Sequence, residues 1–270
     1  MELKNIFDRL WKDYYDQNPS VRKIYDLFIK EGEAIVNDHI AFRTLDFAEI
    51  SIEVIAKPFV SAGYVPKGEY MFKDKHLFAR HFENPADEKA PRVFISQLIL
   101  KECSLFIRET FNNLVRKSDP EKFSSGELIF SGTLFNPLSY DIYKRLRDES
   151  EYAAWFYVFG FRANHFTVSI NSLKKYDNIL KVNDLIKRNG FILNSSGGEI
   201  KGTPADLLQQ SSTMADIVSI NFREGAFDIP SCYYEFAMRY PGSDGKLYGG
   251  FNASTADKIF ESTDFYTRDV

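Results

Sequence analysis

The sequence carries a long-period internal repeat, and this repeat limits the folds that the chain can adopt. DHIAFRTL at 38–45, a helical pattern and AGY at 62–64 are echoed by NHFTVSIN at 164–171, a helical pattern and NGF at 189–191. His165 follows His39 by 126 residues, and Gly190 follows Gly63 by 127. The repeat predicts a fused pair of similar modules, and the alternative is a chance similarity between two ordinary α+β segments.

Each half of the repeat is a strand, a helix and about three further strands, which defines a βαβββ module. Two such modules side by side predict an α+β fold with one curved mixed sheet around a cavity. We expect a single domain over 1–270. Its segments are a helical N-terminal segment at 1–35, the first module at 36–103, a helical insertion at 104–155, the second module at 156–245 and a C-terminal tail at 246–270.

Sequence patterns in the second half of the chain predict one helix, three strands and a loop-like tail. Leu173, Tyr176, Ile179, Leu180 and Ile186 share one side of a helical pattern, which predicts a helix over 172–189. Apolar runs predict strands over 191–194, 214–222 and 231–240. The Gly-, Ser- and Asp-rich stretch PGSDGKLYGGF predicts a loop-like tail.

Composition excludes several classes of protein. The net charge is −4 and no basic stripe with interleaved aromatics is present, so nucleic-acid binding is not expected. The first 15 residues alternate charged and apolar positions, which argues against a signal peptide or a membrane span. Cys103 and Cys232 are too few for a disulfide scaffold. These features predict a cytoplasmic protein without a membrane partner, and they leave its oligomeric state open.

Three predicted strands each have one polar face, because side chains two positions apart point the same way. The polar faces consist of His39, Ala41 and Arg43; His165, Thr167 and Ser169; and Tyr233, Glu235, Ala237 and Arg239. The opposite faces consist of Ile40 and Phe42; Phe166, Val168 and Ile170; and Tyr234, Phe236 and Met238. Polar faces inside an aromatic-rich protein predict a cavity with convergent groups, the usual form of a ligand site.

Two imidazoles and one carboxylate on these faces form the donor set of a non-haem Fe(II) site. His39 and His165 occupy matching positions on the first strands of the two modules, so pseudo-symmetry brings them together. Glu235 lies on the last strand of the second module, which runs beside its first strand. We therefore predict that His39, His165 and Glu235 bind Fe(II).

Other interpretations of these residues remain open from the sequence alone. A single His is more often a core or surface residue than a ligand, and this applies also to His76 and His81. Glu235 could instead pair with Arg239 or Arg43, because a buried carboxylate needs a partner.

Arg43 lies on the same strand face as His39. A guanidinium near a divalent cation is repelled unless an anion lies between them. An acidic substrate supplies that anion, since a carboxylate pairs bidentately with arginine. We predict that Arg43 binds substrate and belongs to the catalytic site, with Thr167, Ser169, Tyr233 and Arg239 as further pocket-lining residues. The alternative is an exposed arginine.

Three segments together resemble one known family. HIAFRTL at 39–45, NHFTVSI at 164–170 and YYEFAMRYP at 233–241 resemble the 2-oxoadipate dioxygenase/decarboxylase family, the 2-hydroxyglutarate synthases. The resemblance runs from about residue 20 to 245. This family was formerly a domain of unknown function and is related to the vicinal oxygen chelate superfamily. The resemblance implies Fe(II) bound by His39, His165 and Glu235, with Arg43 on the substrate carboxylate.

The resemblance also implies a reaction and a biological setting. A 2-oxo dicarboxylic acid such as 2-oxoadipate reacts with O₂ and gives CO₂ and a 2-hydroxy acid such as 2-hydroxyglutarate, a step in lysine catabolism. The alternatives are another metalloenzyme of the same fold, either an extradiol dioxygenase or a glyoxalase-like isomerase, and a non-catalytic module that binds a small acid. Family members with longer chains carry a second substrate arginine in C-terminal sequence that has no clear counterpart here.

Overall fold

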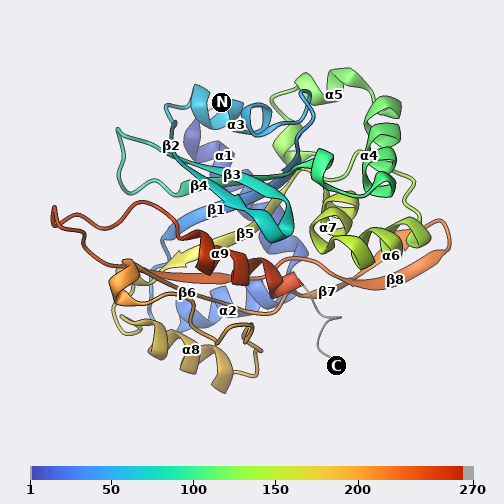
Figure 1. Cartoon of the computed structure of the whole chain (residues 1–270). Coiled ribbons are helices and arrows are strands. Elements are labelled where there is room, and N and C mark those ends of the chain that lie inside the picture. Colours follow the sequence, from blue (N-terminus) through green and yellow to red (C-terminus); the bar gives the residue numbers. More distant parts are fainter. Residues whose placement is uncertain (1, 264–270) are drawn as a thin grey trace.

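The computed structural model describes residues 2–263 and begins with two helices (Figure 1). They are α1 (Leu3–Gln17) and α2 (Pro19–Lys30). Pro19 stands at the first turn of α2, where its missing N–H removes no helical hydrogen bond. Both helices bury an apolar stripe against the sheet. Within the described residues, no helix is long and apolar enough to cross a membrane.

The first module has the expected βαβββ order. Its elements are β1 (Asn37–Leu45), α3 (Ile52–Ser61), β2 (Val65–Phe72), β3 (Leu77–Glu83) and β4 (Arg92–Leu98). β1 pairs with β4 in parallel, while β3 pairs antiparallel with both β2 and β4. The first strand of the module therefore lies at one side of its four-stranded sheet, next to the second module.

Helices occupy the segment between the modules. They are α4 (Leu105–Lys117), α5 (Pro120–Ser124), α6 (Tyr140–Glu149) and α7 (Glu151–Phe159). α7 begins after Ser150, whose side chain caps the N–H of Ala153. Every residue of α7 after Glu151 is buried, so this helix is apolar all round and forms part of the core.

The second module is a reduced version of the first. It contains β5 (Ala163–Ser169), α8 (Ile179–Arg188), β6 (Leu208–Ser212) and β9 (Glu235–Arg239). β5 and β9 are parallel and β6 is antiparallel to β9, as in the first module. The strand that would correspond to β2 is reduced to an isolated bridge between Lys201 and Gln210.

Several boundaries differ from the sequence-based expectations. The helix predicted over 172–189 begins at Ile179, because the Glu33 carboxylate accepts hydrogen bonds from the backbone N–H groups of residues 174–176. The predicted strand at 191–194 is wrong, and only Leu193 forms an isolated bridge there. The predicted strand at 214–222 is shorter, as β7 (Ile217–Phe222), and it pairs only with β8 (Gly225–Pro230) in a separate hairpin.

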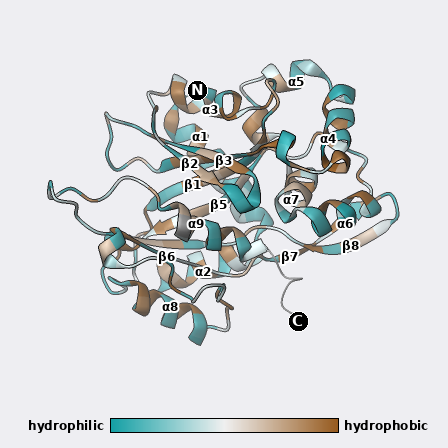
Figure 2. Cartoon of the chain, viewed as in Figure 1, coloured by the Kyte–Doolittle hydropathy of each residue, from teal (hydrophilic) through white to brown (hydrophobic). Residues whose placement is uncertain are grey.

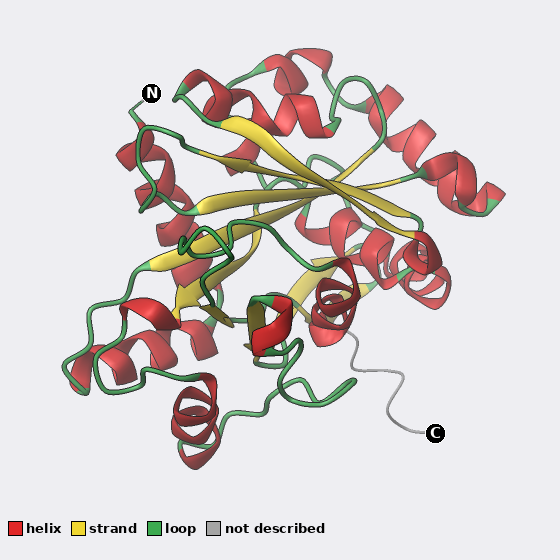
Figure 3. Cartoon of the chain, turned by 60° about the vertical axis from the view of Figure 1, so that its left-hand side comes forward, coloured by secondary structure: helices red, strands yellow, loops and turns green. Residues whose placement is uncertain are grey.

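The modules join through antiparallel pairing of β1 and β5, which gives one seven-stranded sheet in the described residues. Its strand order is β2-β3-β4-β1-β5-β9-β6. Helices surround this sheet (Figure 3). Peripheral helices such as α8 carry both hydrophilic and hydrophobic residues (Figure 2), as expected for helices with one buried stripe. The predicted α+β fold with two fused modules and a curved mixed sheet is confirmed.

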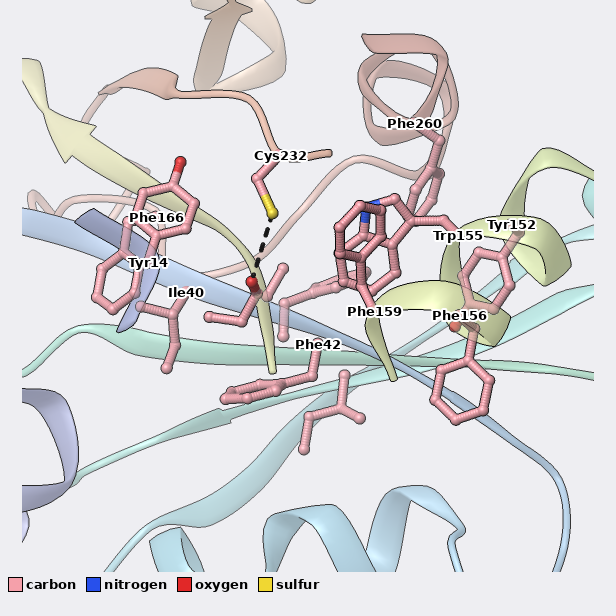
Figure 4. Close-up of a cluster of buried hydrophobic side chains, with 14 of the residues drawn as sticks. Tyr14, Ile40, Phe42, Tyr152, Trp155, Phe156, Phe159, Phe166, Cys232 and Phe260 are labelled. Atoms are coloured by element: carbon pink, nitrogen blue, oxygen red, sulfur yellow. Dashed lines mark hydrogen bonds between the residues drawn. The ribbon is translucent and has the colours of Figure 1, made fainter. Parts of the chain in front are cut away.

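The two faces of the sheet have different partners. Ile40, Phe42 and Phe166 point toward an apolar cluster that includes Tyr14 of α1 (Figure 4). The rings of Trp11 and Phe166 meet edge-on with centroids 5.1 Å apart. Because side chains alternate along a strand, this packing directs the polar residues of β1 and β5 to the other face.

A C-terminal helix covers that other face. α9 (Ala253–Phe260) lies across the front of the sheet in Figure 1, although the sequence predicted a loop-like tail over 246–270. The short apolar run around Ile259 and Phe260 is too brief to indicate a helix on its own. Residues 264–270 of that tail lie outside the described residues.

Candidate metal centre

Three strands bring His39, His165 and Glu235 to one point. The strands are neighbours, in the order β1, β5 and β9. In the pairing register, Thr167 of β5 lies opposite both His39 and Glu235. His165 is two positions earlier on β5, so its side chain points to the same face as that of Thr167. Strand register therefore explains why residues far apart in the sequence converge.

The three side chains lie within coordination range of one metal ion. His39 Nε2 lies 3.4 Å from Glu235 Oε1, and His165 Nε2 lies 3.2 Å from Glu235 Oε2. One potential ligand atom from each residue falls within 4.8 Å of the others. The side chains are deeply buried, with residue exposures of 2%, 5% and 0% for His39, His165 and Glu235. Within the described part of the chain, these are the His, Cys, Asp or Glu side chains that form such a group.

Burial makes each of these groups prefer its uncharged form. Desolvation lowers the pKa of His39, and desolvation together with the nearby His39 lowers the pKa of His165 well below its usual value. Desolvation also raises the pKa of Glu235 to about 8, although a hydrogen bond from Gln210 acts in the opposite direction. Neutral imidazoles are the form that binds a metal. The carboxyl group must lose its proton when a cation arrives.

The contacts of Glu235 suit a metal ligand. Gln210 Nε2 donates to Oε1 at 2.5 Å and holds the carboxyl group in place. Oε2 accepts no hydrogen bond from any of residues 2–263, although Glu235 is fully buried. Burying such an oxygen without a partner is unfavourable, and a divalent cation between the two imidazoles would satisfy it. The donor set therefore fits a metal ion.

His39 is held by a charged network. Its Nδ1 lies 2.7 Å from Asp38 Oδ1, and its Nε2 lies 3.1 Å from the Thr167 hydroxyl. Asp38 also receives two hydrogen bonds from Arg239, from Nε at 2.7 Å and from Nη2 at 2.9 Å. Burial alone would raise the pKa of Asp38, but Arg239 and the hydrogen bond with His39 hold that pKa well below its usual range. Asp38 is thus an acceptor for the Nδ1–H group of His39.

The Nδ1 atom and the ring face of His165 have neutral neighbours. Its Nδ1 lies 3.1 Å from the Asn164 side-chain oxygen. Its ring stacks on Tyr233, with centroids 4.8 Å apart and planes 29° from parallel. The Tyr233 hydroxyl finds no hydrogen-bond partner among residues 2–263, and burial raises its pKa well above the usual value. Tyr233 therefore presents a neutral hydroxyl next to the candidate centre.

Arg43 lies deep in the protein and already has partners. Nη1 donates to both Glu151 oxygens, at 3.1 and 3.2 Å, and Nη2 donates to the Thr263 hydroxyl at 3.2 Å. Its guanidinium lies about 5 Å from the ring centroids of Tyr152 and Trp155. The open alternative of an exposed arginine is wrong, because the residue is 1% exposed. Its contact with a substrate stays a prediction.

Three of the four predicted pocket residues do not line the cavity next to Glu235, and Thr167, whose hydroxyl contacts His39, is one of them. Ser169 is half-buried at the end of β5, and its hydroxyl accepts a long hydrogen bond from Ser172. Arg239 is buried, but its donors serve Asp38 and two backbone carbonyls. Neither residue lines the cavity next to Glu235. Contacts of these residues with a substrate stay predictions, since strand parity identifies a face and not a distance from the centre.

The other two histidines do not join the group. His76 is largely exposed and lies 3.4 Å from Glu102. His81 is buried, with Nδ1 2.8 Å from the Tyr70 hydroxyl and Nε2 3.2 Å from Glu83. Both lie in the first module, and His81 approaches the site through Phe251, whose ring centroid lies 5.3 Å from that of His81.

The cavity beside the three side chains is small. Its volume is about 20 Å³, which is room for one water-sized ligand. The sheet contributes one side of the cavity, and the C-terminal segment (residues 250–263) contributes the other. The lining residues are His39, Phe94, His165, Gln210, Tyr233, Glu235, Phe251, Ala256, Ile259 and Phe260.

Four supporting residues were missed at the sequence level. Asp38 and Asn164 each directly precede the His of a repeated segment, so the repeat itself contained a signal for them. Gln210 had no such signal, because it lies in the polar segment LQQSS, which does not resemble a buried strand. Phe251 follows a glycine-rich loop, and only the fold brings its ring edge-on to His39, with centroids 4.8 Å apart.

Solved structures place this architecture in a known class. A protein from Ralstonia eutropha that is assigned to the glyoxalase superfamily is 20% identical to this chain, with a TM-score of 0.74. The match covers 90% of this chain and 83% of that one. That similarity concerns the fold alone. The paired modules and this neighbour together define the class of fold, a pair of fused βαβββ modules that share one mixed sheet.

Sequence comparison then identifies the family. The profile of the 2-oxoadipate dioxygenase/decarboxylase family matches residues 6–124 and 129–242. The chain belongs to this family. A relative from rice, named 2-oxoadipate dioxygenase/decarboxylase, is 35% identical over 97% of this chain and 78% of its own length.

Two solved structures are similar over nearly the whole chain. A hydroxyglutarate synthase from Oryza sativa, solved in complex with 2-oxoadipate, has a TM-score of 0.87 and 34% identity, and the match covers 98% of this chain and 93% of that one. A protein from Shewanella frigidimarina, provisionally described as a hydrolase, has a TM-score of 0.88 and 48% identity, with coverage of 93% and 98%.

Proposed function

We propose that this protein is an Fe(II)-dependent 2-oxoadipate dioxygenase/decarboxylase. It converts a 2-oxo dicarboxylic acid and O₂ into CO₂ and a 2-hydroxy acid that is one carbon shorter. The observation that carries the proposal is the buried convergence of His39, His165 and Glu235, with an unpartnered Glu235 oxygen, in a chain of this family. The rice structure with bound 2-oxoadipate supports the class of substrate.

The donor set decides which chemistry a bound metal could perform. Iron held by two imidazoles and one carboxylate would leave coordination positions for a 2-oxo acid and O₂ and would supply electrons to O₂. The protein's own part is to fix the ligands and exclude water. Asp38 directs Nδ1 of His39 away from the centre, so that Nε2 faces it. Phe251, Ile259 and Phe260 cover the centre with apolar surface.

Arg43 is the proposed partner of the substrate's distal carboxylate. Glu151 and Thr263 hold its guanidinium in the described structure. A substrate carboxylate would replace the Thr263 hydroxyl and share or replace Glu151 on the same donors. A cavity of about 20 Å³ is too small for a six-carbon dicarboxylic acid, and we expect the C-terminal residues that line it, Phe251, Ile259 and Phe260, to make room for the substrate.

Gas exchange tests the reaction directly. Protein prepared with Fe(II) is supplied with 2-oxoadipate and with other 2-oxo acids, and O₂ uptake, CO₂ release and the hydroxy acid are measured together. The proposal requires one O₂ consumed and one CO₂ released for each 2-hydroxyglutarate formed. Turnover without O₂ would instead indicate a glyoxalase-like isomerase, and hydrolysis without O₂ would indicate a hydrolase.

Variants of the ligands test the metal site. His39→Ala, His165→Ala and Glu235→Ala should each lose both bound iron and O₂ uptake, because the remaining two ligands hold a divalent cation weakly. His76→Asn is the matched control, since His76 lies outside the group and asparagine accepts its left-handed backbone (φ 54°). Iron retained by all three alanine variants, or absent from wild type, would favour a binding module without metal.

A further inference from the structure

Arg239 is a buried arginine that does not itself line the candidate cavity, although its guanidinium lies 5.1 Å from the ring centroid of Phe251, which does. It lies on β9, four residues after Glu235, and is 2% exposed. One edge of its guanidinium grips Asp38, with Nε 2.7 Å from Oδ2 and Nη2 2.9 Å from Oδ1. This fork-to-carboxylate geometry fixes both side chains more tightly than a single hydrogen bond would.

The Asp38 carboxylate that Arg239 binds also orients His39. Asp38 Oδ1 lies 2.7 Å from His39 Nδ1, so Arg239, Asp38 and His39 form a continuous chain of hydrogen bonds. His165 has a neutral amide, Asn164, in the corresponding position. The charged support is therefore confined to the first-module ligand and depends on an arginine from the second module.

The other edge of the same guanidinium holds the loop over the site. Nη1 donates to the carbonyl oxygens of Tyr248 at 2.8 Å and Gly250 at 2.7 Å. The next residue, Phe251, lines the cavity and meets the His39 ring edge-on. Its backbone N–H donates to the Tyr70 hydroxyl at 3.0 Å, so the loop is also tied to the first module.

We propose that Arg239 is a positioning residue that couples the orientation of His39 to the closure of loop 248–251 over the metal centre. The coupling needs the planar fork, because one edge must hold a carboxylate while the other reaches two carbonyls. A lysine ammonium at this position cannot span both edges. The metal part of this inference rests on the proposed role of His39 as a ligand, whereas the loop part does not.

Two variants distinguish the contact of Arg239 with Asp38 from its contacts with the loop carbonyls. Arg239→Lys keeps the charge and loses the fork. Asp38→Asn keeps a side-chain oxygen for His39 and weakens the carboxylate edge, while the carbonyl edge of Arg239 remains. Arg92→Lys is the matched control, because Arg92 also approaches Asp38, at 3.8 Å, but makes no hydrogen bond to the loop. Near-UV circular dichroism selects variants that keep the native fold.

Hydrogen exchange of metal-free protein measures whether Arg239 holds loop 248–251 in place. The amide of Tyr248 bonds the Tyr240 carbonyl, and that of Phe251 bonds Tyr70, so both are protected while the loop is closed. Arg239→Lys should raise exchange in peptides covering 248–251 by about tenfold or more, since at least one charge-assisted hydrogen bond is lost. Asp38→Asn should also raise this exchange, by a smaller factor, because it loosens the same guanidinium through its other edge. Arg92→Lys should leave this exchange near the wild-type rate.

Anaerobic titration with Fe(II) or Mn(II) measures whether Arg239 and Asp38 support His39 as a metal ligand. Affinity should fall roughly 10- to 100-fold in both Arg239→Lys and Asp38→Asn, the usual effect of losing support for a metal ligand. Arg92→Lys should bind like wild type. Unchanged loop exchange and unchanged affinity in natively folded Arg239→Lys would overturn the proposal. If wild type bound no metal, the proposed function would fail, while loop exchange in Arg239→Lys would still decide whether Arg239 holds the loop.

Discussion

Glu235 is the residue whose state depends most on whether a cation is present. It is fully buried between two neutral imidazoles, and Gln210 satisfies only one of its oxygens. In metal-free protein, burial raises its pKa to about 8, so it retains a proton over a pH range in which the unfolded chain has lost it. Glu235 should therefore make metal-free protein less stable as the pH rises.

Glu235→Gln tests this linkage. Between the usual carboxyl pKa and about pH 8, the folded protein binds more protons at this site than the unfolded chain, so wild-type stability falls relative to the variant. The gain in unfolding free energy from the substitution should grow by on the order of 1 kcal/mol per pH unit and level off above about pH 8. Urea unfolding with a chelator measures it. A difference that is independent of pH would show that Glu235 is ionised in the metal-free fold.

Arg43→Lys tests the substrate carboxylate at the residue scale. The variant keeps the charge but loses the bidentate fork, so KM for 2-oxoadipate should rise about tenfold or more while iron content is unchanged. KM for 2-oxohexanoate, which lacks the distal carboxylate, should change little. Arg80→Lys is the control, because Arg80 pairs with Glu53 and Glu69 near the surface. Equal effects on both acids would place the distal carboxylate elsewhere.

At the scale of elements, apolar patterns predicted the strands that carry the ligands. β1 and β5 bury one face on aromatic residues, so alternation in the sequence was visible. β6 was missed because its polar side chains find buried partners that no local pattern shows. Ser211 donates to Asn183, Ser212 pairs with Ser262, and Gln210 donates to Glu235. A strand stabilised through such contacts does not have the apolar alternation of a core strand.

The helix of the C-terminal segment was also not predicted from the sequence, although its residues complete the lining of the candidate site. The two ends of the segment are tied to distant parts of the chain, with the carbonyl of Gly250 on Arg239 and the hydroxyl of Thr263 on Arg43. Phe260 lies between these ends, with its ring centroid 6.4 Å from that of Tyr152 of α7 and 5.9 Å from the Arg43 guanidinium (Figure 4). The segment occupies space that a substrate between Arg43 and the metal centre would need.

Phe260 should therefore limit substrate entry. Phe260→Ala should raise kcat/KM for 2-oxoadipate several-fold, and Phe260→Trp should lower it, because one change enlarges the cavity and the other fills it. The alanine variant should also lose up to about 3–5 kcal/mol of stability, as a buried Phe-to-Ala change does. Steady-state kinetics and thermal unfolding measure both effects.

Phe123→Ala is the control for this prediction. Phe123 is buried in α5 and packs against Phe161, away from the cavity, so its loss should lower stability without changing kcat/KM. A fall in kcat/KM for both Phe260 variants would mean that the ring contributes to the productive complex instead of obstructing entry.

At the scale of the whole molecule, the candidate centre lies where the two modules join. The repeat made the meeting of His39 and His165 predictable, since pseudo-symmetry relates the first strands of the two modules, whereas the direct pairing of those strands was not predicted. His39 comes from the first module, whereas His165 and Glu235 come from the second. The pairing of β1 and β5 is the main sheet contact between the modules, and a metal ion would add a cross-link at the same place.

Metal binding should therefore stabilise the complete fold. Anaerobic Fe(II) or Mn(II) at a hundredfold excess over Kd should add roughly 2.7 kcal/mol, which for a chain of this size raises Tm by about 5–10 °C. His39→Ala and His165→Ala should each abolish that shift, because either change leaves two ligands, which hold a divalent cation weakly. His76→Asn should keep it. Calorimetry with and without metal measures the shift, and its persistence in His39→Ala would mean that the ion is held by the second module alone.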